Sequence, residues 1–114
     1  MTWDEAVACA LALPDTELST SYGKPAVKIA SNGRAFLFPS HEADTSFAVA
    51  IDLDTVEILK ATEPETYWQT PHYEGWPAVL IRYEAADEER VRDTIRRSHA
   101  YAAALPKSRP RKRK

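Results

Sequence analysis

The sequence has few of the residues on which common catalytic and redox motifs depend. Of its 114 residues, one is a cysteine, Cys9, and three are glycines. A lone cysteine forms no internal disulfide and no thiolate zinc site by itself, which agrees with a reducing compartment. The glycines at positions 23, 33 and 75 lie where turns are expected. None of them belongs to a phosphate-cradling loop, a dinucleotide fingerprint or a Gly-x-Ser-x-Gly elbow.

Long hydrophobic runs are missing as well. No apolar run approaches the roughly 20 residues that span a bilayer, and residues 1–5 lack the basic and then apolar order of a secretory signal. We therefore expect a cytoplasmic protein with no membrane partner. The sequence leaves the oligomeric state open, with a monomer favoured.

Metal and catalytic signatures are equally sparse. The histidines, His41, His72 and His99, are dispersed and form no His-x-x-His or His-x-x-x-His pair. No pair of carboxylates stands out for acid and base catalysis. We therefore predict no metal site, no catalytic residues and no cofactor, and we expect that the protein is not an enzyme.

Basic residues, by contrast, are concentrated at the C-terminal end of the sequence. Residues 107–114 hold six of the fifteen Lys and Arg residues and no acid, whereas residues 1–106 carry nine basic against seventeen acidic residues, a formal net charge of −8. We predict one folded domain over 1–106 and a disordered basic tail over 107–114. Such a tail points to a polyanion such as DNA. The tail residues expected to contact phosphates are Lys107, Arg109, Arg111, Lys112, Arg113 and Lys114.

Hydrophobic periodicity and capping residues predict an α+β domain. Helices are expected at residues 3–12, from Asp52 or Asp54 to about 61, and at 87–104. Strands are expected at 26–30, 34–38, 47–52 and 78–83, and a short strand or turn at 65–69. Thr2 and Glu5 have the spacing of a capping box at the start of the first helix.

The Asn-Gly dipeptide at residues 32–33 predicts a hairpin. Both residue types tolerate positive φ and suit a two-residue type I′ turn. The register that follows pairs Ile29 with Phe36 and Val27 with Phe38, which places four large apolar side chains on one face. Basic residues lead into and flank this hairpin, and we predict that they form a second contact for phosphates. They are Lys24, Lys28 and Arg34.

The arginines of the last predicted helix are interpreted differently. Glu88 with Arg92, and Asp93 with Arg97, have i, i+4 spacing. We therefore expect a solvent face of salt bridges, and not a binding stripe, from Arg90, Arg92, Arg96 and Arg97.

A rigid, aromatic-rich segment lies between Thr70 and Pro77. In one interpretation Tyr73 and Trp76 cover the end of the core while His72 bonds a backbone carbonyl. In the other, these side chains contact a ligand. The residues of the possible pocket are Tyr22, His72, Tyr73 and Trp76.

The chain resembles the MmcQ/YjbR family of small bacterial proteins in the order of its motifs. These are Ala12-Leu13-Pro14-Asp15, then Ser21-Tyr22-Gly23-Lys24-Pro25-Ala26-Val27-Lys28, then Thr70-Pro71-His72-Tyr73-Glu74-Gly75, and an apolar strand ending in Arg82. The resemblance covers about residues 3–105. It implies a compact, CyaY-like α+β fold, an antiparallel sheet packed by the N- and C-terminal helices, and DNA binding without a catalytic set. The family's recurrent positions fall on Pro14, Tyr22, Gly23, Lys24, Pro25, Lys28, His72, Tyr73 and Gly75, and Val27 stands where many relatives have an aromatic residue.

Two functional hypotheses follow. The first is a non-enzymatic DNA-binding protein of low sequence specificity, with phosphate contacts from the tail and the hairpin. Because residues 1–106 are acidic overall, any binding surface on the domain requires local clustering of Lys24, Lys28 and Arg34. The alternative is a small protein-interaction or ligand-binding module with a pocket near His72, Tyr73 and Trp76.

Overall fold

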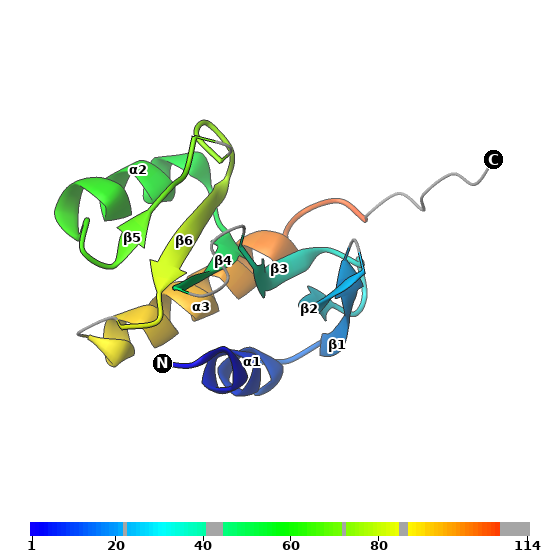
Figure 1. Ribbon diagram of the computed structural model, residues 1–114. Coiled ribbons are helices and arrows are strands. Elements are labelled where there is room, and N and C mark those ends of the chain that lie inside the picture. Colours follow the sequence, from blue (N-terminus) through cyan, green and yellow to red (C-terminus); the bar gives the residue numbers. More distant parts are fainter. Residues whose placement is uncertain (22, 41–44, 72, 85–86, 108–114) are drawn as a thin grey trace.

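Three helices and six strands follow one another in the part of the chain that the computed structural model describes, residues 1–21, 23–40, 45–71, 73–84 and 87–107 (Figure 1). The helices are α1 (Trp3–Leu11), α2 (Leu53–Thr62) and α3 (Glu88–Ala103). The strands are β1 (Thr16–Ser21), β2 (Lys24–Ile29), β3 (Ala35–Pro39), β4 (Ser46–Ala50), β5 (Tyr67–Trp68) and β6 (Ala78–Arg82). None of the described helices is long and apolar enough to cross a membrane.

Local capping explains where the helices begin. Thr2 and Glu5 form both hydrogen bonds of the predicted capping box at the start of α1. The side chain of Asp52 accepts a hydrogen bond from the Thr55 N–H, and that of Asp87 accepts one from the Arg90 N–H. These contacts satisfy N–H groups that have no partner within a helix. The helix predictions are therefore confirmed to within one or two residues.

The strands form one antiparallel sheet in the order β1-β2-β3-β4-β6-β5. Helices α1 and α3 pack against one another and on β1 to β4, and α2 lies beside β5 and β6 (Figure 1). Residues of all three helices share one core with the sheet. This arrangement confirms the predicted α+β fold with N- and C-terminal helices against an antiparallel sheet. The strand residues that share a core with the helices are Val27, Ile29, Phe36, Leu37, Phe47, Val49, Tyr67, Val79 and Ile81.

Successive side chains of a strand point to opposite faces. The residues that alternate with the core residues therefore point away from the helices, on a side that we call the helix-free face. It includes Glu17, Lys24, Lys28, Phe38, Ser46, Ala48, Trp68, Leu80 and Arg82.

The predicted register of the β2–β3 hairpin is wrong. Gly33 N–H donates to the Ile29 carbonyl and Ile29 N–H donates to the Arg34 carbonyl, both at 2.8 Å, so the loop has four residues instead of two. Val27 pairs with Leu37, and a shift of register follows before Lys28. This bulge places the consecutive residues Phe36 and Leu37 in the same core, which a regular alternation would not allow.

The tertiary contacts of Asn32 explain the difference. Asn32 is buried, and its Nδ2 donates to the carbonyls of Ala102 at 2.8 Å and Leu105 at 3.2 Å. Its Oδ1 accepts a hydrogen bond from the Arg34 N–H. Asn32 does not have the positive φ of a type I′ turn. Its side chain instead donates to one carbonyl in the last turn of α3 and to one just beyond the helix, which ties the hairpin loop to the end of α3.

Strand β1 is absent from the sequence-based prediction. It is an edge strand of polar residues in which Leu18 is 56% exposed, so no apolar alternation marks it. Its start is set by Asp15, which has a φ of 59° and whose carbonyl accepts a hydrogen bond from the Ala30 N–H.

Candidate nucleic-acid interface

All charged residues of the six strands lie on the helix-free face. They are Lys24, Lys28 and Arg82, with Glu17 as the single acid. Lys28 lies opposite Glu17 in the β1–β2 register, and Arg82 lies opposite Ser46 in the β4–β6 register. The sheet therefore presents three cations against one carboxylate, although the domain as a whole is acidic.

The basic residues of the helices are neutralised by nearby carboxylates. The pairs are Lys60 with Glu57 (3.4 Å), Arg90 with Glu63 (2.8 Å), Arg92 with Glu88 (3.7 Å) and Glu89 (3.3 Å), and Arg96 (3.7 Å) and Arg97 (3.0 Å) with Asp93. This confirms the prediction of a salt-bridged face on α3. Such exposed pairs add little to stability, but each puts a carboxylate beside the cation, which weakens the attraction of the arginine for a polyanion; Arg96 and Arg97 share Asp93.

The cations of the sheet and hairpin differ in this respect. Within the described residues, no carboxylate lies within 4.0 Å of the basic groups of Lys24, Lys28, Arg34 or Arg82. Even Glu17, the neighbour of Lys28, makes no ion pair with it. These four side chains therefore keep their charge available to an external anion.

The hairpin also fixes the place where the basic tail begins. Arg34 Nε donates to the Pro106 carbonyl at 2.8 Å, beside the two bonds from Asn32 to the end of α3. Exposed Lys107 follows directly. Arg34 is thus turned toward the tail, whereas Lys24 and Lys28 point to the helix-free face, so the three predicted residues do not converge on one patch. The tail residues Arg109, Arg111, Lys112, Arg113 and Lys114 lie outside the described residues.

An aromatic and cationic group on the helix-free face was missed in the sequence. The Arg82 guanidinium lies 4.5 Å from the centroid of the Trp68 ring, and Trp68 Nε1 donates to Ser46 Oγ at 3.1 Å. Strand pairing continues from Trp68 through Leu80 and Ala48 to Phe38. We call these four residues the apolar row. β5 lies within the short strand or turn predicted at 65–69, but its two residues carry no periodicity that indicates which face Trp68 occupies.

Two of the four residues of the predicted pocket, Tyr73 and Trp76, lie in one turn of the described part of the chain, where the Trp76 N–H donates to the Tyr73 carbonyl. Tyr22 and His72 lie outside that part. Tyr73 is half-buried, which raises the pKa of its hydroxyl, and Trp76 is 64% exposed and does not cover the core. Gln69 holds their loop, because its Nε2 donates to the carbonyls of Tyr73, Trp76 and Ala78.

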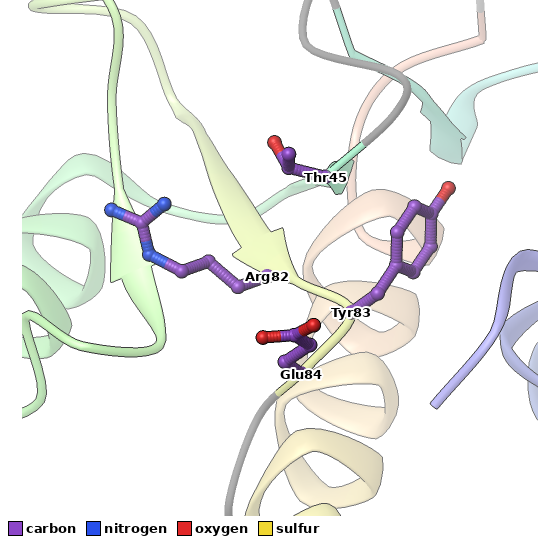
Figure 2. A pocket seen from close by; sticks show the side chains of 4 residues that line it. All are labelled: Thr45, Arg82, Tyr83 and Glu84. Atoms are coloured by element: carbon purple, nitrogen blue, oxygen red, sulfur yellow. The ribbon is translucent and has the colours of Figure 1, made fainter.

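A cavity of about 240 Å³ lies at the end of β6, lined by Thr45, Arg82, Tyr83 and Glu84 (Figure 2). Figure 2 shows that the Arg82 and Tyr83 side chains point in opposite directions from the strand. Tyr83 stacks on Phe47, with ring centroids 5.6 Å apart, and burial raises the pKa of its hydroxyl.

Other reactive side chains of the described residues have structural surroundings. Cys9 is half-buried in α1, and burial is the main cause that raises the pKa of its thiol, which disfavours the reactive thiolate. His99 Nε2 donates to the Pro14 carbonyl at 2.8 Å, and its ring meets Phe36 edge-on. No group of three or more His, Cys, Asp and Glu side chains in this part of the chain could hold a metal ion.

The fold and the distribution of charge define a small α+β domain that presents unpaired cations beside its hairpin and on one sheet face. The family model described as YjbR matches residues 11–101. The chain therefore belongs to the YjbR family, as its motifs predicted. Neither the curated proteins nor the solved structures include a significant match to it.

Proposed function

We infer that the protein is a non-enzymatic DNA-binding protein that contacts phosphates with little sequence specificity. One observation carries this proposal: within the described residues, the helical cations are paired with carboxylates, whereas those of the sheet and hairpin are not. A free lysine or arginine binds a phosphate without first losing a carboxylate partner. The available positive charge is thus local, on an otherwise acidic domain.

The position of the tail supports the same proposal. Arg34 and Asn32 bind the chain just before Lys107, so the first residue of the basic segment 107–114 follows directly from the hairpin contacts. Eight extended residues reach roughly 26 Å, well beyond the screening length of about 8 Å at physiological salt. The tail therefore reaches a phosphate backbone despite the acidic groups of the domain.

The test is the salt dependence of binding to a short labelled duplex, measured by fluorescence anisotropy. If all six tail charges neutralise phosphates, the slope of log affinity against log salt is about −5. A chain that ends at Pro106 should lose most of this slope, because only the cations of the domain remain. An unchanged slope in the shortened chain would contradict the proposal.

Amide chemical shifts distinguish this function from the alternative of a ligand-binding or protein-interaction module. On titration with duplex DNA, we expect shift changes at Lys24, Lys28, Arg34 and the tail. Shifts confined to the loop of Tyr73 and Trp76, or no shifts at millimolar DNA, would favour the alternative.

A further inference from the structure

The helix-free face carries a second kind of contact that phosphate binding alone does not use. We propose that this face binds single-stranded nucleic acid, with unpaired bases stacked on Phe38 and on the Trp68–Arg82 pair. The proposal rests on the proposed function and names the form of nucleic acid and the residues that select it. Lys24 and Lys28 would contact the phosphates of the same strand.

The composition of this face supports stacking. Phe38, Trp68 and Arg82 are half-buried and thus partly accessible, while Ala48 and Leu80 between them are fully buried. The surface that a base can contact therefore lies at the two ends of the apolar row, at Phe38 on β3 and at Trp68 with Arg82 on β5 and β6. Aromatic rings and guanidinium planes are the surfaces on which unpaired bases stack.

The same face is poorly equipped to recognise a duplex by sequence. Base edges in a groove are recognised by free hydrogen-bonding groups, and the Ser46 hydroxyl beside the apolar row already accepts the Trp68 N–H. In a duplex the faces of the bases are stacked on one another, so they cannot stack on a protein ring. A single strand exposes both its phosphates and its base faces, which fits cations and rings on one surface.

The dimensions agree with a short strand. Four strand spacings separate β2, which carries Lys24 and Lys28, from β5, which carries Trp68. At about 4.8 Å each, they span roughly 19 Å. The phosphate contacts of β2 and the stacking contacts of β3, β5 and β6 can therefore engage successive nucleotides of one strand.

The experiment measures the affinity of the full chain for two labelled nucleic acids: an oligothymidine of about 12 nucleotides and a duplex with a similar number of phosphates. The oligothymidine length lies within the site sizes of single-strand-binding folds. Three variants test the face: Phe38→Leu, Trp68→Leu and Arg82→Gln. Each aromatic variant should weaken oligothymidine binding roughly tenfold and leave duplex binding nearly unchanged.

Arg97→Gln is the matched control for Arg82→Gln. It also removes one positive charge, but Arg97 is paired with Asp93 on the helical side. The affinity of the Arg97→Gln variant for oligothymidine should therefore match that of the unaltered chain. Thermal unfolding identifies any variant that fails to fold. If Trp68→Leu is one of these, Phe38→Leu and Arg82→Gln together still decide the question.

The outcomes separate this inference from the function on which it rests. Both the stacking face and the proposed function are supported if the chain binds oligothymidine more tightly than the duplex. This preference should be lost in Phe38→Leu and Arg82→Gln and kept in Arg97→Gln. If the chain binds oligothymidine and the duplex with equal affinity, and Phe38→Leu changes neither affinity, the stacking face is overturned. DNA binding itself is then still supported. Binding of neither nucleic acid at low salt overturns both.

Discussion

The two sides of the sheet use cations in opposite ways. On the helical side, Arg90, Arg92, Arg96 and Arg97 each have a carboxylate within 4.0 Å. On the helix-free face and its hairpin, Lys24, Lys28, Arg34 and Arg82 have none among the described residues. The comparison teaches that the net charge of a domain says little about a local binding surface. What matters is which cations already have partners.

The largest expected effect concerns stability and the apolar residues of β3. Phe36 is fully buried on the helical side, whereas Phe38 is half-buried on the helix-free face. Phe36→Ala should lower the free energy of unfolding by about 3–5 kcal/mol, because it leaves a cavity in the core. Phe38→Ala should cost clearly less, as measured by urea denaturation of both variants. Equal losses would show that the two sides are equally buried in solution.

A smaller effect is expected where the hairpin meets the helical side. Asn32→Ala removes the donor to the Ala102 and Leu105 carbonyls and the acceptor for the Arg34 N–H. Buried polar groups left unpaired cost about 1–3 kcal/mol, and the same denaturation measures the loss. Asn32→Asp is the sharper control, because it keeps the acceptor and loses the donor. If Asn32→Ala has full stability, the side chain does not fix the loop.

The smallest effect should appear in the salt dependence of DNA binding. Lys28→Gln removes an unpaired cation and should reduce the magnitude of the slope by about 0.9. Arg96→Gln also removes one charge, but Arg96 is paired with Asp93, so the slope should not change. Titration of a labelled duplex at several salt concentrations measures both. A larger change in the Arg96 variant would break the distinction between paired and unpaired cations.

The predictions from sequence succeeded where structure depends on neighbouring residues. The capping residues Thr2, Asp52 and Asp87 act on N–H groups within three positions, so a local pattern suffices to find them. The ion pairs of Arg92, Arg96 and Arg97 within α3 have i, i+3 and i, i+4 spacing, which also makes them predictable from the sequence. The pair of Arg90 with Glu63 joins two elements and has no such spacing.

The failures involve residues that meet only in the folded chain. Asn32 contacts residues about 70 positions away, and these contacts replaced the turn that its local pattern favoured. Trp68 and Arg82 are 14 positions apart and meet only because β5 and β6 are neighbours. No periodicity in two residues of β5 could indicate which face Trp68 occupies.

By itself, the sequence determined the positions of the helices, the basic character of residues 107–114 and membership in the YjbR family, because each depends on local order or on motifs. Only the tertiary structure decided which cations lack a carboxylate partner and which side chains share the helix-free face. Charge pairing and face assignment depend on distances across strands and between layers, and the packing of the core sets those distances.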